Sequence, residues 1–328
     1  MILKQVIPII LTNSQSSATP TPFQHMFTYP VASNSLINSD CSNVRFHDIN
    51  GNVITSWLED TSGTWWLLLI NGIPANSDVI IYMHIYDSSN FMFDGSSVGE
   101  ASQLSPTYGE YDNGANVFIQ YGGKSWSDFT FSGGTWDTTN GYLEQTDTLS
   151  SAANGAVAVI ENTSYPNNGE YIIEQAFSYS VNAVAGVGIV AVLMPEAGGG
   201  CGYRFLGTNQ GNGAGFLSFL NDDVAWVNSN SYQGAVATPY FMSITNAGGI
   251  WSGQLRSGYS STGSLLTSMA AVSYTVANAA GNTSGYVGIS ASYQGSSDNP
   301  IAVQWFRLRA YPPNGVMPFQ SYGNILFY

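Results

Sequence analysis

Two pairs of acidic residues are spaced so that they could serve a hydrolytic reaction. Glu170 and Glu174 in GEYIIEQAF stand four residues apart and therefore share one face of a strand, while Glu110 and Asp112 stand two apart. Cleavage of a glycosidic bond needs two carboxylates that face the same sugar. No Glu-x-Asp-x-Glu run occurs, and neither pair has an activating partner in the sequence. We therefore expect Glu170 at a strand end, Glu174 facing solvent, and no enzymatic activity.

Other catalytic and metal-binding patterns are missing from the sequence. It has no phosphate-binding loop, no Cys-x-x-Cys pair and no His-x-x-x-His pair. The histidines stand apart from one another: His25, His47 and His84. Calcium is conceivable at Asp222, Asp223 and Asp298, but Asp is also favoured in solvated turns, which is the interpretation we prefer. We expect no metal and no cofactor.

Two cysteines and two sequons are the remaining candidates for covalent chemistry. Cys41 and Cys201 lie far apart in the chain, so they either form one disulfide that closes a very long loop or are both free and buried. Asn162 and Asn282 each begin an Asn-Thr-Ser sequon in a turn-like stretch. We regard both as candidate glycosylation sites.

The composition restricts the partners of the chain. Only 9% of the 328 residues are charged, the net charge is −14, and Lys4 and Lys124 are the only lysines. No basic groove can form along a phosphate backbone, so nucleic acid is excluded as a partner. Few charges combined with many neutral hydrogen-bonding side chains are common in proteins that face the medium and pack against copies of themselves. The alternative is a merely acidic soluble protein.

The first residues, MILKQVIPIILTNSQ, do not form a membrane segment. The apolar run after Lys4 is short and is interrupted by Pro8, so it is too short for a signal-peptide core or a membrane span. Either the chain is the mature form of an exported protein or export is by another route. In both cases we expect an extracellular protein, at a cell surface or a virion surface.

Alternating apolar residues and frequent turn formers predict an all-β protein. Short strands recur along the chain, and the Asn-Gly pair in DINGN predicts a tight hairpin turn. Most tryptophans fall in alternating strand contexts where a large ring is usually buried: Trp65, Trp66, Trp126, Trp136 and Trp305.

The length predicts two β domains. The pattern divides the chain into an N-terminal strand (1–13), a small β domain (14–95), a connection in which the periodicity weakens (96–125) and a β-sandwich (126–328).

Several segments resemble a known group of proteins. DCSNVRFHDINGNVITSWLED, GIPANSDVIIYM and VQWFRLRAYPPNGVMP resemble archaeal and bacterial surface proteins that carry a small β domain of unknown function before a sandwich of the concanavalin A-like, laminin-G type. GTWDTTNGYLEQTD resembles the first hairpin of such a sandwich. The resemblance implies a jelly-roll sandwich used for surface display, filament building or sugar binding. It points to a filament subunit, a pilus-like fibre, of an archaeal cell or virus.

The ends of the chain are candidates for assembly by donor-strand complementation. An apolar strand precedes a flexible Ser/Thr/Pro-rich run, and could add to the sheet of a neighbour in a homopolymer: Val6, Ile7, Pro8, Ile9, Ile10 and Leu11. SYGNILFY at the other end is the second candidate. Pairing of the first strand inside its own domain is an equally good interpretation. Under strand exchange, deletion of residues 1–13 should leave folded, soluble monomers that cannot polymerise.

A glycan-binding adhesin is the alternative function. Exposed aromatic rings stack on sugars, and the chain has 20 Tyr, 16 Phe and 8 Trp. Binding of cell-surface glycans by monomers would favour that function over assembly.

Overall fold

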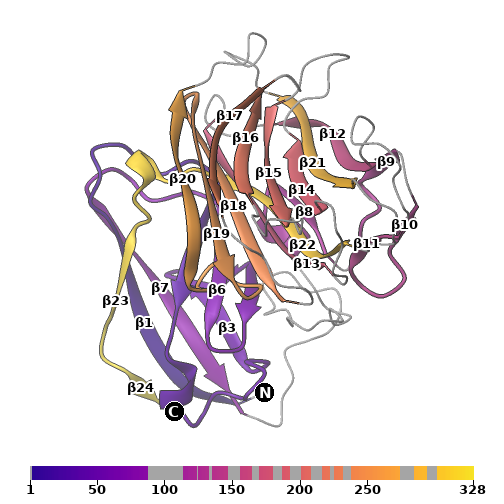
Figure 1. Cartoon of the computed structure of the whole chain (residues 1–328). Helices are drawn as coiled ribbons and strands as arrows, with labels where there is room; N and C mark the ends of the chain where they lie inside the picture. The colour runs from indigo at the N-terminus through magenta and orange to yellow at the C-terminus, as the bar shows by residue number, and fades with distance from the viewer. Residues whose placement is uncertain are drawn as a thin grey trace. The chain divides into compact units, whose positions relative to one another are not determined.

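The computed structural model describes thirteen stretches of the chain, to which all structural statements refer: residues 2–87, 114–123, 125–132, 135–146, 156–164, 170–179, 187–192, 201–207, 216–221, 225–231, 238–273, 284–293 and 301–328. The chain divides into two units. Unit 1 contains Met1–Lys124 and Arg309–Tyr328, and unit 2 contains Ser125–Leu308 (Figure 1).

The chain is all-β, as predicted. Within the described stretches, helix is limited to α1 (Gly114–Val117) and the short 3-10 turns Val31–Ser33 and Pro313–Gly315. The fold of each unit is therefore decided by the pairing of its strands.

Unit 1 is built from two antiparallel sheets. Sheet A has the order β23-β1-β7-β3-β4, with β24 also paired to β1, and sheet B has the order β2-β6-β5. The strands of sheet A are β1 (Leu3–Asn13), β3 (Val44–Asp48), β4 (Val53–Ile54), β7 (Ser77–Tyr86), β23 (Phe319–Tyr322) and β24 (Leu326–Phe327). Those of sheet B are β2 (Phe23–Thr28), β5 (Ser56–Asp60) and β6 (Thr64–Leu69).

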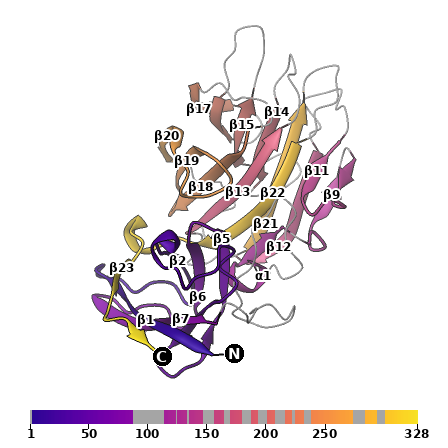
Figure 2. The ribbon, with the colours of Figure 1, turned by 90° about the horizontal axis from the view of Figure 1, so that it is seen from below.

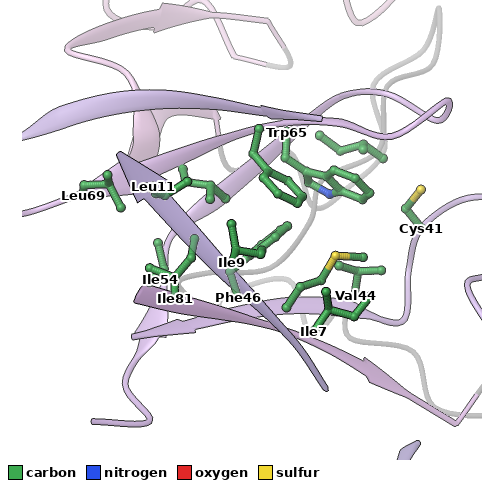
Figure 3. Close-up of a cluster of buried hydrophobic side chains, with 14 of the residues drawn as sticks. Ile7, Ile9, Leu11, Cys41, Val44, Phe46, Ile54, Trp65, Leu69 and Ile81 are labelled. Carbon is green, nitrogen blue, oxygen red and sulfur yellow. The ribbon is translucent and has the colours of Figure 1, made fainter. Parts of the chain in front are cut away.

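The core of unit 1 lies between these sheets. Strand side chains alternate between the two faces, so Ile7, Ile9 and Leu11 of β1 all point inward. Figure 3 shows them sharing the interior with Trp65 and Leu69 of sheet B. Each fully buried aliphatic side chain contributes about 1.5–3 kcal/mol. β1 is therefore an integral part of its own unit.

The predicted connection (96–125) is partly packed structure. Residues 88–113 lie outside the described stretches, but α1 and β8 (Gln120–Gly122) belong to unit 1. The ring of Phe118, just after α1, meets the rings of Trp57 and Trp66 at 5.3 and 5.7 Å. This segment therefore covers the face of sheet B that points away from the core.

Unit 2 contains two larger sheets. Sheet C runs β10-β11-β22-β13-β18-β19-β20, and the seven-stranded sheet D runs β17-β16-β15-β14-β21-β12-β9 (Figure 2). Along this order the strands of the eight-stranded sheet C are β10 (Trp136–Asp137), β11 (Leu143–Gln145), β13 (Tyr171–Tyr179), β18 (Tyr240–Ala247), β19 (Ile250–Ser257), β20 (Leu265–Ser273) and β22 (Ile301–Ala310), and β8 also pairs with β22. Those of sheet D are β9 (Thr130–Ser132), β12 (Ala156–Ser164), β14 (Val187–Val192), β15 (Cys201–Gly207), β16 (Phe216–Asn221), β17 (Ala225–Ser231) and β21 (Ser284–Tyr293).

The division differs from the predicted one at the end of the chain. We expected the sandwich to extend over 126–328, but Arg309–Tyr328 returns to unit 1. The physical reason is strand pairing, because β23 and β24 form ladders with β1. Unit 1 is thus assembled from both ends of the chain, with unit 2 inserted between them in the sequence. No periodicity of a single strand indicates its distant partner.

Candidate functional site

β1 occupies an interior position in sheet A. On one side it pairs with β7 along its whole length, from Leu3 opposite Tyr86 to Asn13 opposite Ser77. Its polar ends are buried and bonded, because Gln5 accepts a hydrogen bond from Asn34 and the Asn13 amide donates to the carbonyl of Ser17 at 2.9 Å. The predicted assembly strand is therefore tied down within its own chain.

The other side of β1 carries a shorter, broken ladder. β23 pairs with Ile9–Thr12, β24 pairs only with Gln5 and Val6, and the ladder is interrupted around Pro8. The Pro8 carbonyl accepts a bond from the Gly323 amide at 2.9 Å. In an antiparallel strand the N–H and C=O of one residue point the same way, so the donor that proline lacks is missing on this side.

The prediction for Pro8 is thus resolved by the structure. Because proline lacks a backbone donor, it is found in strands at an edge or at an irregularity. Here the irregular ladder lies on the side of β23 and β24, while pairing with β7 is continuous past Pro8. Gly323 fits here because an added Cβ would lie only 3.0 Å from the Pro8 Cβ.

The segment that fills this side, residues 316–328, is hereafter called the C-terminal segment. It holds many of the most exposed apolar side chains among the described residues: Val316, Phe319, Tyr322, Ile325, Leu326, Phe327 and Tyr328, which are between 43% and 72% exposed. Figure 1 shows β23 and β24 running along β1 at the margin of the sheet. An apolar edge strand of this kind is a template for pairing with another chain.

The C-terminal segment also bonds to sheet B. The Tyr322 hydroxyl donates to the Thr28 carbonyl at 2.6 Å, and Gln320 accepts from the Thr28 amide at 3.1 Å. The Tyr322 ring meets Phe27 and Tyr29 edge-on, and burial raises its pKa above the ordinary value for tyrosine. The segment therefore closes the gap between β1 and β2 on one flank of unit 1.

Cys41 does not form the disulfide considered from the sequence. It is a free, fully buried thiol whose Sγ lies 3.8 Å from the Thr61 carbonyl, and its pKa is raised to about 12, chiefly by burial. Cys41 belongs to unit 1, whereas Cys201 begins β15 in unit 2 and its side chain lies outside the described part. Distance in the sequence left both alternatives open, and burial in the core of unit 1 keeps the Cys41 thiol unpaired.

The expectation that Glu174 faces solvent is wrong. Glu174 is 3% exposed, and its carboxylate is bonded at 2.5 Å to Nε of Arg307, which is itself fully buried. The guanidinium also lies over the ring of Trp305, 4.4 Å from its centroid. Glu170 precedes β13, as expected of a strand end. A buried carboxylate neutralised by arginine is a structural ion pair and offers no free acid for hydrolysis.

The other residues singled out from the sequence are placed as follows. Asn162 lies within β12, at a register irregularity between Ile160 and Thr163, and not in a turn. Trp65, Trp66, Trp126 and Trp305 are buried as expected, while Trp136 is partly exposed. The remaining candidates fall outside the described stretches: Glu110, Asp112, Asp222, Asp223, Asn282 and Asp298.

Sequence reasoning missed the residues of sheet B that receive the C-terminal segment. Nothing in the run FQHMFTYP around Thr28 indicates a partner almost three hundred residues away. The usable signal was SYGNILFY itself, an apolar run with strand-forming residues next to Gly323.

Comparison with known proteins identifies a distant viral relative. No protein-family model matches the chain. A protein of Sulfolobus islandicus rod-shaped virus 1, called uncharacterized protein 562, is 27% identical over 336 residues, which cover 94% of this chain and 57% of the relative. The chain thus spans little more than half the length of that viral protein.

Two of the solved structures with a similar course of the chain are lectins. The seed lectin of Lotus tetragonolobus aligns at a TM-score of 0.44 and 11% identity, covering 63% of this chain and 98% of the lectin. Lectin I of Ulex europaeus, solved with the methyl glycoside of α-L-fucose, aligns at 0.44 and 15% identity, covering 58% of this chain and 95% of the lectin.

The helices in the described stretches are short. Among the described residues, no helix has both the length and the apolar character needed to cross a bilayer.

Proposed function

We propose that the chain is a structural subunit of an extracellular filament or coat, in which the C-terminal segment of one copy pairs with β1 of the next. The observation that carries this proposal is the broken, one-sided ladder on β1, filled by an apolar segment whose large side chains are mostly exposed. The viral relative is compatible with a surface role.

Of the two candidate donor strands, we infer that the C-terminal one, which contains SYGNILFY, is exchanged and that β1 is not. Withdrawing β1 as a donor would expose Ile7, Ile9 and Leu11, at a cost of about 1.5–3 kcal/mol for each side chain. Deletion of residues 1–13 should therefore unfold unit 1 and not leave folded monomers. β1 is the acceptor strand, and the C-terminal segment is the donor.

When the C-terminal segment leaves its own β1, it loses interactions that it can form again with a neighbouring copy. An incoming segment finds the same β1 ladder, the same Thr28 carbonyl and the same aromatic rings. Exchange between copies therefore reproduces the interactions made within one copy.

The link before the segment has features of a hinge. It contains Pro312 and Pro313, and Asn314 adopts a positive φ of 53° that is uncommon for a residue with a side chain. Short connections under strain favour exchange between copies. Because each copy carries one donor and one acceptor, a head-to-tail relation produces an open filament and a reciprocal one a dimer.

Disulfide trapping tests the exchange directly. Ile10 and Ser321 are opposite each other in the β1–β23 ladder. We expect a mixture of I10C chains and S321C chains, assembled together and oxidised, to give a cross-linked dimer on non-reducing gels. The double variant in assembled material should give a ladder of higher oligomers.

The matched control replaces Ser321→Cys by Val316→Cys, because Val316 is 45% exposed and has no partner in the β1–β23 ladder. V316C chains should not cross-link to I10C chains. The proposal is wrong if two results are seen together in assembled material on non-reducing gels. The double variant would form its disulfide only within single chains, and the mixture of single variants would give no cross-linked dimer.

A further inference from the structure

The face of sheet A that points away from the core, hereafter called the outer face, carries exposed apolar side chains. Ile7, Ile9 and Leu11 of β1 point inward, so the alternate positions of β1 and the residues opposite them form the outer face. Four apolar residues of this face are between 37% and 57% exposed: Val53, Ile80, Phe319 and Leu326. Exposed apolar surface gathered on one face is typical of a contact with another protein.

The strand registers arrange the outer face in rows, because residues opposite each other in a ladder share a face. Phe319 of β23 and Asp78 of β7 lie in one row, since both are opposite the same residue of β1. Leu326 of β24 and Arg45 of β3 lie in another row, which crosses β1 and β7. These are the two end rows, and the apolar rows between them include Ile80.

The two end rows carry opposite charges. Asp78 is exposed in the first, and Arg45 is partly exposed in the second. Lys4, near the second end row, is neutralised by Asp87 at 3.5 Å, and the Asp48 carboxylate accepts hydrogen bonds within its own hairpin. The first end row is therefore acidic and the second basic.

This arrangement makes the outer face complementary to itself. A two-fold axis that runs across the strands, midway between the end rows, brings each end row of one copy onto the other end row of a second copy. Asp78 of each copy then faces Arg45 of the other, and Phe319 of each copy faces Leu326 of the other. Charge and apolar surface are matched by the same rotation.

We propose that two copies of the chain pack face to face through the outer faces of their A sheets, about such a two-fold axis. Two sheets packed in this way lie about 10 Å apart, with the apolar side chains of both interdigitating between them. Strand exchange joins copies along the edge of β1, whereas this contact joins them across the face. It does not depend on exchange, because an exchanged segment places Phe319 and Leu326 at the same positions.

Charge reversal in the full chain tests this contact. Sedimentation of the wild type at low ionic strength, where charges are least screened, should show a dimer. Asp78→Arg alone and Arg45→Asp alone should each weaken dimerisation about tenfold or more, because like charges then meet across the interface. An equimolar mixture of the two variants should restore the dimer, since every charged contact then again joins opposite signs.

Asp128→Arg is the matched control, because Asp128 is also exposed but belongs to unit 2. It makes the same change of charge and should dimerise like the wild type. Ile80→Asp places a charge among the apolar rows and should abolish the dimer. Asp78 and Ile80 are both exposed, so their variants decide the matter even if Arg45→Asp fails to fold.

Three results would each overturn the proposal. They are a wild type that stays monomeric at every concentration, a dimer that persists in both Asp78→Arg and Ile80→Asp, and a folded Arg45→Asp that does not restore the dimer in the mixture. A dimer formed by strand exchange would persist in these variants and would cross-link in the disulfide experiment above. The face-to-face contact and the exchange can therefore fail separately.

Discussion

His25 is a polar side chain in an apolar core. It lies between Phe23 and Phe27 on the inward face of β2, and all three are fully buried. Neither ring nitrogen has a hydrogen-bond partner among the described residues, and burial lowers the pKa of His25 from 6.5 to about 3. The folded protein therefore keeps this ring neutral at a pH where the unfolded chain binds a proton.

This difference makes unit 1 sensitive to acid. Because the pKa of His25 is lower in the folded protein than in the unfolded chain, acid favours the unfolded chain. The free energy of unfolding is unaffected above about pH 6.5 and falls as the pH drops toward 3, by on the order of 5 kcal/mol in total. We expect His25→Leu to be at least as stable as the wild type at pH 7 and to lose less stability between pH 7 and pH 4. Urea unfolding followed by tryptophan fluorescence measures both. Equal pH dependence in the two proteins would contradict this assignment.

At the scale of the element, Gly323 sets how closely the C-terminal segment lies on β1. An added Cβ would stand 3.0 and 3.3 Å from the Pro8 ring, too close for an unshifted contact. We expect Gly323→Val to push the segment away from β1 and to raise the rate of chymotryptic cleavage at Tyr322 and Phe327 several-fold.

Asn324→Val is the control for this experiment, since Asn324 is an exposed neighbour of Gly323 in the same connection between β23 and β24. It adds a comparable side chain without the contact to Pro8. Equal cleavage rates in the two variants would show that the close approach at Pro8 does not hold the segment in place.

At the scale of the whole molecule, unit 1 depends on residues from both ends of the described chain. The side of β1 that faces β23, together with Phe27 and Tyr29 of the β2 flank, is covered only when the C-terminal segment is present. Removing residues 316–328 should therefore lower the unfolding temperature of unit 1 and leave that of unit 2 unchanged, as measured by differential scanning calorimetry.

A synthetic peptide of residues 316–328 should restore the lost stability in proportion to its concentration, because a ligand that binds only the folded state stabilises it. A peptide with the same composition in scrambled order is the control. If the truncated chain melts like the wild type, the C-terminal segment does not contribute to unit 1.

The sequence by itself determined the class of the fold and much of its core. Strand-forming residues with a period of two predicted an all-β chain, and they placed Trp65, Trp66 and Trp305 in the interior. These properties are local, because the alternation of side chains across a strand follows from backbone geometry alone.

Only the tertiary structure decided which strands and side chains meet. β1 is fixed in unit 1 because β7 and the core hold it, Glu174 is buried because Arg307 lies opposite, and His47 stacks on His84 because β3 pairs with β7. Each of these contacts joins residues distant in the sequence, and their register is fixed by packing across the whole sheet. A pattern read along one strand carries no information about the strand beside it.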